Sequence, residues 1–242
     1  MSNEIIYGVN SVTEALKSGN RTFFRIIAAR ETSQRISETL KLARSRNIRI
    51  DFLEKKTMDK ICQSPHHQGL AAEVSPLKTY EIFEALRCEN GSKKAMWLAV
   101  DSLTDPGNLG SLIRSAVCLG FSALILPKNR SASVTGTVAK ISSGAVEKIK
   151  LVEVVNLNQA ILELKGKGFW IYGADAKGES IHKADFAFPL MLVVGAEGEG
   201  LHLKTKEHCD KIVCIPQRSD FDSLNAAVAG AILMYEISKR YK

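Results

Sequence analysis

The sequence predicts an α/β protein in two parts, a small N-terminal α/β/α unit and a larger domain with a mostly parallel sheet. The chain has 242 residues of ordinary globular composition, 45% of them hydrophobic, which excludes a disordered or fibrous protein. Residues 89–94 are polar and typical of turns, and from Ala95 onward short apolar runs alternate with helical patterns. Such alternation is typical of a parallel sheet that helices cover on both faces.

The N-terminal unit is predicted to span residues 1–76. A short strand or turn comes first, followed by a helix that begins near Ser11, with Ser11 as its N-cap, Glu14 three residues later and Gly19 at its end. The elements expected after it are strands at 23–29, 48–52 and 69–74 and helices at 33–45 and 57–63.

A linker is placed at residues 77–94, because Pro76 ends the preceding strand and the segment holds one amphipathic helix, 80–87, followed by the turn-rich stretch. The second domain is predicted to span residues 95–242. Its expected strands are 96–100, 122–126, 151–155, 170–175, 190–194 and 212–215. Four helices are expected: one that begins at Asn108 and three that span 134–143, 157–165 and 223–241.

Charge is distributed unevenly along the chain. The net charge is +7, and residues 17–49 alone contain nine Lys or Arg and only two Glu. Seven of the nine are arginines, which suit forked contacts to phosphate, so this stretch is either a nucleic-acid-binding face or a solvated helix surface.

The apolar runs, the N-terminus and the cysteines indicate the expected location and redox state of the protein. The longest apolar runs, 186–196 and 226–235, fall short of the ~20 residues that a membrane-spanning helix needs. With no signal-peptide pattern at the N-terminus, we expect a cytoplasmic protein without membrane contact. The five cysteines are scattered and include no C-x-x-C pair, so we expect reduced thiols and no metal site.

Three segments could carry chemistry, and the first is DPGNLG at 105–110. It follows a strand and opens a helix whose apolar stripe leaves Arg114 on the polar side. Ligands of open α/β sheets bind at such edges, where backbone N–H groups point outward. Arg114 is therefore either a functional residue or a solvent-exposed one.

The second segment is LVVGAEGEGL at 192–201, an apolar strand that runs into three glycines. Its G-x-x-G-x-G spacing is not the dinucleotide fingerprint G-x-G-x-x-G. Glu197 and Glu199 would repel a phosphate, so the loop favours a neutral or cationic ligand if it is more than a tight turn. The third segment is the helix rich in small residues after Ser223 and Asn225, where either side chain could face a ligand and Ser223 is expected to be the N-cap.

Taken in order, DPGNLGSLIR, GAEGEGL and IPQRSDFDSLNAAVAGAILMYE resemble the three motifs of the SpoU (TrmH) family of RNA ribose 2′-O-methyltransferases. The N-terminal region, with IYGVNSVTEAL and HHQGLAAEV, resembles the L30-like RNA-binding domain of the family's 23S rRNA guanosine methyltransferases. The resemblance implies a SPOUT domain with a C-terminal trefoil knot that binds S-adenosylmethionine. It also implies a homodimer whose active site lies at the subunit interface and whose substrate is ribosomal RNA.

The resemblance also implies roles for individual residues. The positions that match the family's polar active-site residues are Arg114, Asn108, Glu197, Ser223 and Asn225. The positions that match its cofactor-binding residues are Gly195, Ile215, Leu224, Gly200 and Pro216. Because a guanidinium holds its proton firmly, we expect Arg114 to stabilise negative charge on the reacting oxygen or a phosphate rather than to act as a base.

The sequence departs from the family pattern in two places. The loop before Ser223 is Gln217-Arg218-Ser219-Asp220-Phe221-Asp222 where the family has small residues and glycine, and Ala226 and Ala227 replace the more usual Val and Ser. Two alternatives to a 23S rRNA guanosine methyltransferase therefore stay open. One is a tRNA guanosine 2′-O-methyltransferase, and the other is a catalytically silent RNA-binding assembly factor.

Overall fold

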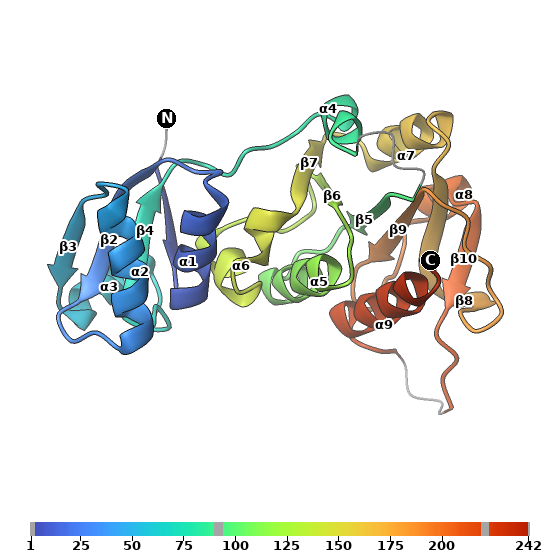
Figure 1. Ribbon diagram of the computed structural model, residues 1–242. Coiled ribbons are helices and arrows are strands. Elements are labelled where there is room, and N and C mark those ends of the chain that lie inside the picture. Colours follow the sequence, from blue (N-terminus) through green and yellow to red (C-terminus); the bar gives the residue numbers. More distant parts are fainter. Residues whose placement is uncertain (1–2, 90–93, 219–222, 242) are drawn as a thin grey trace. The chain divides into compact units, whose positions relative to one another are not determined.

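The computed structural model describes residues 3–89, 94–218 and 223–241, so part of the predicted turn at 89–94 and of the loop at 217–222 lies outside the described residues. The described chain forms two compact units (Figure 1). The first contains the residues up to Lys78 together with Val134–Lys148, and the second contains Thr79–Ser133 and the residues from Ile149 onward.

The first unit is built on a four-stranded sheet. Its strands are β1 (Glu4–Tyr7), β2 (Phe23–Ala29), β3 (Ile50–Leu53) and β4 (Leu70–Val74), in the order β1-β4-β2-β3. Only β2 and β3 pair in parallel. The accompanying helices are α1 (Val9–Ser18), α2 (Gln34–Ser45), α3 (Lys55–Cys62), α6 (Gly136–Ile141) and the short 3₁₀ helix η1 (Ala145–Lys148).

The segment Val134–Lys148 joins this unit although the sequence predicts it in the second domain. Two hydrogen bonds hold it there: Tyr7 Oη and Thr137 Oγ1 lie 2.9 Å apart, and the buried Ser11 Oγ donates to the Ala139 carbonyl at 2.9 Å. The Arg21 guanidinium also donates to Glu147 at 2.8 Å, and both side chains are 1% exposed. The segment is therefore part of the core of the first unit.

The predicted start of the first helix is wrong. Helix α1 begins at Val9, its N-cap is Gly8 with φ of 95°, and Ser11 lies inside the first turn. A serine followed three residues later by glutamate matches the capping pattern, but here the hydroxyl of Ser11 is committed to the distant Ala139 carbonyl.

The second unit contains a six-stranded sheet in which every pairing is parallel, and the predicted α/β class with a parallel sheet is confirmed. Its strands are β5 (Met96–Asp101), β6 (Ala123–Pro127), β7 (Lys150–Val154), β8 (Trp170–Ser180), β9 (Leu190–Gly195) and β10 (Lys211–Cys214), in the order β10-β8-β9-β5-β6-β7. Its helices are α4 (Ile82–Arg87), α5 (Pro106–Cys118), α7 (Leu157–Gly166), α8 (Leu203–His208) and α9 (Ala226–Lys239).

Helices cover both faces of this sheet (Figure 1). On one face, α4 and α7 pack on a core centred on Trp97, whose ring centroid lies 5.1 Å from that of Phe169. On the other face, α5 and α9 pack so closely that a side chain at Gly230 would overlap Leu112. The central strands β5 and β9 are buried along their whole length, which explains their continuous apolar sequences.

Candidate functional site

A cavity of about 630 Å³ opens where β8, β9 and β10 end and α9 begins. Its walls come from the end of β8, the loop after β9, the chain after β10 and the first turns of α9. Parallel strands place their carboxyl ends at one edge of the sheet, which is where open α/β sheets bind ligands.

The loop after β9 forms one wall of the cavity. Ala196 and Gly200 exchange two backbone hydrogen bonds, of 3.2 and 3.0 Å, which close the loop into a tight turn. A side chain at Gly195 would overlap the backbone of Gly200, so glycine is required at this position. The turn leaves Glu197 and Glu199 exposed beside the cavity.

A hydrogen-bonded cluster joins the loop to two helix N-termini. Asn108 Nδ2 donates to Glu197 Oε2 at 3.0 Å, and Asn225 Nδ2 donates to Asn108 Oδ1 at 2.8 Å and to Glu197 Oε2 at 3.3 Å. Asn108 is in the first turn of α5, where its backbone N–H donates to the N-cap Asp105 at 2.7 Å. The cluster thus brings together three residues that the sequence places 28 to 117 positions apart.

Asn225, and not the predicted Ser223, is the N-cap of α9. Its Oδ1 accepts from the backbone N–H groups of Ala227 and Val228 at 3.0 and 3.2 Å. Because the carbonyl end of the amide caps the helix, the NH₂ end is oriented toward Asn108 and Glu197. Ser223 is exposed and borders the cavity.

Two carboxylates hold the surroundings of the cavity in place. Asp101, at the end of β5, accepts from the backbone N–H of His202 at 2.9 Å and lies 3.0 Å from its ring Nδ1, which anchors the chain just after the glycine loop. Asp175 forms a 2.5 Å ion pair with Lys206. Burial raises the pKa of Asp175. The ion pair with Lys206 and the hydrogen bond from the backbone N–H of Lys177 lower it by a larger amount, so the pKa of Asp175 lies below its ordinary value.

The residues predicted for the site fall into three groups. Those that border the cavity are Gly195, Glu197, Gly200, Ile215, Ser223 and Leu224. Asn108 and Asn225 adjoin it through Glu197. Pro216 does not line it, and Arg114 is exposed on α5 without a hydrogen bond or ion pair to any residue that the structure describes.

Sequence reasoning missed Asp175, Lys177 and Lys206, which also line the cavity. Lys177 belongs to the extension of β8 to Ser180, five residues past its predicted end at Asp175, and Lys206 is on α8, which was not predicted. The pairing of β8 with β10 shifts register at Ile212, so no uninterrupted apolar pattern signals the extension.

Within residues 3–89, 94–218 and 223–241, no three His, Cys, Asp or Glu side chains are grouped in a way that could hold a metal ion. None of the helices in these ranges has the length and apolar character to cross a bilayer. His67 is buried in a turn, where its Nδ1 accepts from the Gly69 N–H and its Nε2 lies 3.1 Å from Asp59 Oδ1.

The protein is of the α/β class, with a cavity at the carboxyl edge of a parallel sheet, where proteins of this class bind their ligands. Comparison with family models matches residues 95–235 to the SpoU rRNA methylase family and residues 5–80 to the substrate-binding domain of RNA 2′-O ribose methyltransferases. The chain therefore belongs to the SpoU family of RNA methyltransferases.

Individual relatives agree with this assignment. A protein of Bacillus subtilis named as a TrmH family tRNA/rRNA methyltransferase is 34% identical over 239 residues, which cover 98% of this chain and 96% of the relative. A Synechocystis protein named as an uncharacterized tRNA/rRNA methyltransferase is 38% identical over 241 residues, and this chain spans 62% of its length.

Solved structures share the fold. The SpoU methyltransferase AviRb of Streptomyces viridochromogenes, in complex with the cofactor AdoMet (S-adenosylmethionine), has a TM-score of 0.81 at 24% identity and matches 98% of this chain and 90% of its own. An AdoMet-bound rRNA methyltransferase of Sinorhizobium meliloti has a TM-score of 0.82 at 21% identity, covering 99% and 88% of the two chains.

Proposed function

We propose that the protein transfers the methyl group of S-adenosylmethionine to the ribose 2′-hydroxyl of a guanosine in 23S ribosomal RNA. The observation that carries this proposal is the Asn108–Glu197–Asn225 cluster beside the glycine-lined cavity. The cluster supports the proposal because fixed amide groups can orient a hydroxyl, and the adjoining cavity has the size that small-molecule cofactors occupy.

The residues around the cavity suit S-adenosylmethionine. Gly195 and Gly200 line the cavity with backbone atoms, and Ile215 and Leu224 supply apolar contacts. Glu197 and Glu199 would attract a sulfonium cation, while Lys177 and Lys206 supply cations for a carboxylate. When bound, the cofactor supplies an electrophilic methyl group, and the protein orients the hydroxyl that attacks it.

The three polar residues have separate roles in this proposal. Glu197 accepts from the NH₂ groups of Asn108 and Asn225 and so fixes the Asn108 amide, whose second N–H and second oxygen lone pair are left to orient the substrate hydroxyl. Ser223, exposed at the cavity, adds a further hydrogen-bonding group. Arg114 stabilises the negative charge that develops on the attacking oxygen or the adjacent phosphate.

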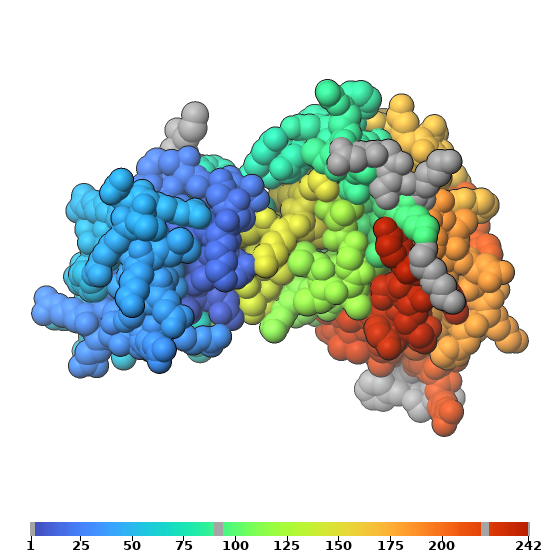
Figure 2. Space-filling view, viewed as in Figure 1, coloured from blue at the N-terminus to red at the C-terminus, as the bar shows by residue number. Residues whose placement is uncertain are grey.

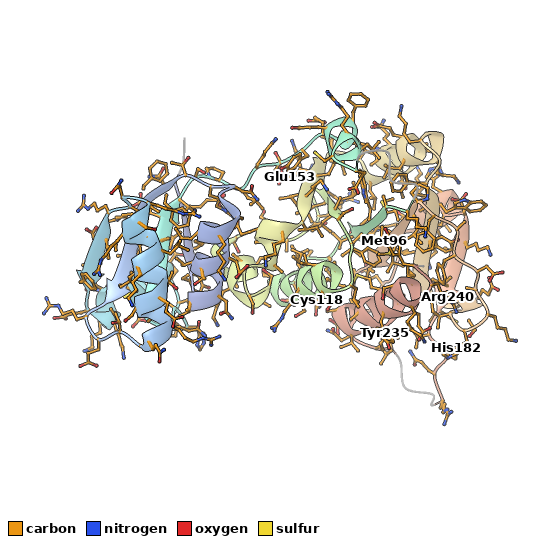
Figure 3. The ribbon with its side chains drawn as sticks, viewed as in Figure 1. Met96, Cys118, Glu153, His182, Tyr235 and Arg240 are labelled. Atoms are coloured by element: carbon orange, nitrogen blue, oxygen red, sulfur yellow. The ribbon has the colours of Figure 1, made fainter. Side chains whose placement is uncertain are left out.

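We propose that Arg114 does this in a partner subunit, since it does not line the cavity of its own chain. An exposed apolar stripe on α9, formed by Val228, Ile232 and Tyr235, supports a homodimer (Figure 3 labels Tyr235). Sedimentation tests this: Ile232→Glu should give a monomer, whereas Leu162→Glu, on the equally exposed surface of α7, should leave a dimer.

The N-terminal region 1–76 is proposed to bind the RNA, with residues 95–242 as the methyltransferase domain. Of the nine basic residues between 17 and 49, five are engaged: Lys17, Arg21, Arg25, Arg46 and Arg49. The remaining four, Arg30, Arg35, Lys41 and Arg44, are exposed and have no ion-pair partner among the described residues. These four are the ones available for phosphate.

One experiment tests the target. Mapping 2′-O-methyl groups in rRNA and tRNA from cells with and without the gene should reveal one 23S rRNA guanosine that loses its methyl group. A lost tRNA methyl group would favour the tRNA enzyme, and unchanged methylation with defective ribosomes would favour an assembly factor. We further propose the trefoil knot of the SPOUT fold in the C-terminal segment and a cytoplasmic site of action.

A further inference from the structure

A second cavity lies beside β7, the edge strand at the opposite end of the sheet from β10. It has a volume of about 380 Å³ and is formed by the start of α4, the end of β7 and the first turns of α7. Figure 2 shows the green surface of α4 next to the gold surface of α7. We call it the β7 groove and define it by Glu81, Phe83, Lys128, Glu153, Val155 and Glu163.

The β7 groove combines large exposed apolar side chains with an excess of negative charge. Phe83 is 62% exposed and Val155 is 75% exposed. The groove is lined by Glu81, Glu153 and Glu163, none of which forms an ion pair with a described residue, and Lys128 is the one basic side chain in its lining. On a chain with a net charge of +7, this acidic lining disfavours RNA and favours a cation.

The edge of the sheet is open at the groove. The backbones of the even-numbered residues of β7 face β6, since Lys150 N–H donates to the Ser122 carbonyl and the Val154 carbonyl accepts from Lys128 N–H. The odd-numbered residues face outward. At Leu151 a segment of the chain already pairs there, because Thr79 forms a parallel bridge and Tyr80 N–H donates to the Leu151 carbonyl at 2.9 Å.

The next outward-facing position is Glu153 (labelled in Figure 3), which lies beside Leu126 of β6 on its inner side and has no strand of the described residues on its outer side. Its backbone N–H and carbonyl are thus available to an extended chain that continues the edge beyond Thr79. A charge on an edge strand can serve merely to prevent aggregation. That reading leaves the exposed Phe83 and Val155 unexplained.

We propose that the β7 groove binds an extended, basic peptide segment of a partner protein. Its main chain pairs with Glu153, its Lys or Arg side chains pair with Glu81, Glu153 and Glu163, and its apolar side chains cover Phe83 and Val155.

The test uses the full-length protein and a fluorescein-labelled ten-residue peptide of alternating Lys and Val. Fluorescence anisotropy should detect binding of this peptide, and no binding of Glu-Val or Lys-Ser peptides of equal length. The triple variant Glu81→Gln, Glu153→Gln, Glu163→Gln should bind at least tenfold more weakly. The charge-matched control, Glu31→Gln, Glu54→Gln, Glu207→Gln, should bind as the parent does.

Hydrogen exchange separates strand addition from simple charge attraction. The Lys-Val peptide should slow exchange of the Glu153 amide, and Phe83→Ala should weaken its binding. Absent binding, equal loss in both triple variants, or binding without protection of the Glu153 amide would overturn the proposal. An RNA oligonucleotide that protects the same amide would also overturn it.

Discussion

Asn225 donates a hydrogen bond to Asn108 across 2.8 Å, although 117 positions separate them in the chain. The same Asn225 side chain caps α9 with its other end. One side chain therefore both starts a helix and fixes the orientation of a second amide at the cavity. Any substitution there changes the stability of α9 and the geometry of the site together unless the cap is kept.

The variant Asn225→Asp separates the two effects. Aspartate caps a helix about as well as asparagine, so the melting temperature should change little. It cannot donate to Asn108, and it places a second carboxylate beside Glu197, so methyl transfer should fall by about 100-fold, as for loss of a positioned donor. Asn156→Asp is the control, because Asn156 caps α7 in the same way. Equal activity of the two variants would contradict the role of Asn225.

Arg114 should matter for turnover and not for folding. Arg114→Ala should lower methyl transfer by about 100-fold while leaving the melting temperature and calorimetric affinity for S-adenosylmethionine unchanged, because its side chain is exposed and unpaired among the described residues. Arg114→Lys should fail almost as badly, since an ammonium cannot make forked contacts. Arg87→Ala, also exposed at a helix end, is the control, and near-normal turnover by the lysine variant would refute the proposed role.

Four basic side chains should carry most of the RNA affinity of the N-terminal unit. Changing Arg30, Arg35, Lys41 and Arg44 to Gln should weaken RNA binding and reduce its log–log salt slope by roughly 0.7 for each phosphate contact removed from single-stranded RNA. The control variant changes an equal number of exposed basic residues elsewhere, Arg87, Lys167, Lys183 and Lys204. Equal salt slopes for the two variants would mean that the four residues are simply solvated.

Truncation should be sensitive to where the chain is cut. A chain that begins at Ser92 loses α4, whose Ile82 and Ala85 are buried in the core cluster around Trp97, and burial of Ile82 alone contributes about 2 kcal/mol. A chain that begins at Thr79 keeps α4 and should melt at a higher temperature. In both, amide exchange of 134–148 should be fast, because its partners Tyr7, Ser11 and Arg21 are gone. Equal melting temperatures would show that α4 adds nothing.

Thiol reactivity should follow burial. Burial raises the pKa of Cys62 to about 11 and that of Cys209 to about 12, so neither forms appreciable thiolate at pH 8. Cys88 is exposed and should react with an aromatic disulfide reagent orders of magnitude faster. Mass spectrometry of the labelled peptides over time gives the order, and early labelling of Cys209 in the folded protein would contradict it.

The sequence predicted those features that local patterns determine. Continuous apolar runs located β5 and β9, and the DPGNLG turn located the start of α5, because burial on both faces and turn chemistry are local in sequence. The motifs also indicated Asn108, Glu197 and Asn225, which the structure brings into contact.

The features that the sequence did not reveal depend on partners that are far away along the chain. Ser11 and Ser223 both look like N-caps, yet Ser11 bonds to Ala139 and the cap of α9 is Asn225. Pattern analysis assigns Val134–Lys148 to the second domain, because nothing within that segment signals that Glu147 pairs with Arg21, 126 positions earlier. Asp175 and Lys206 were missed because only the fold places them beside the cavity.

The position of Val134–Lys148 has a consequence for biosynthesis. Domains tend to fold in order as the chain leaves the ribosome, N-terminal part first. Here the N-terminal unit includes Val134–Lys148, so its buried Arg21 has no Glu147 to pair with until the nascent chain has extended past that residue and through the exit tunnel. The first unit can therefore be completed only when much of the second has already been synthesised, and the two must mature as overlapping events.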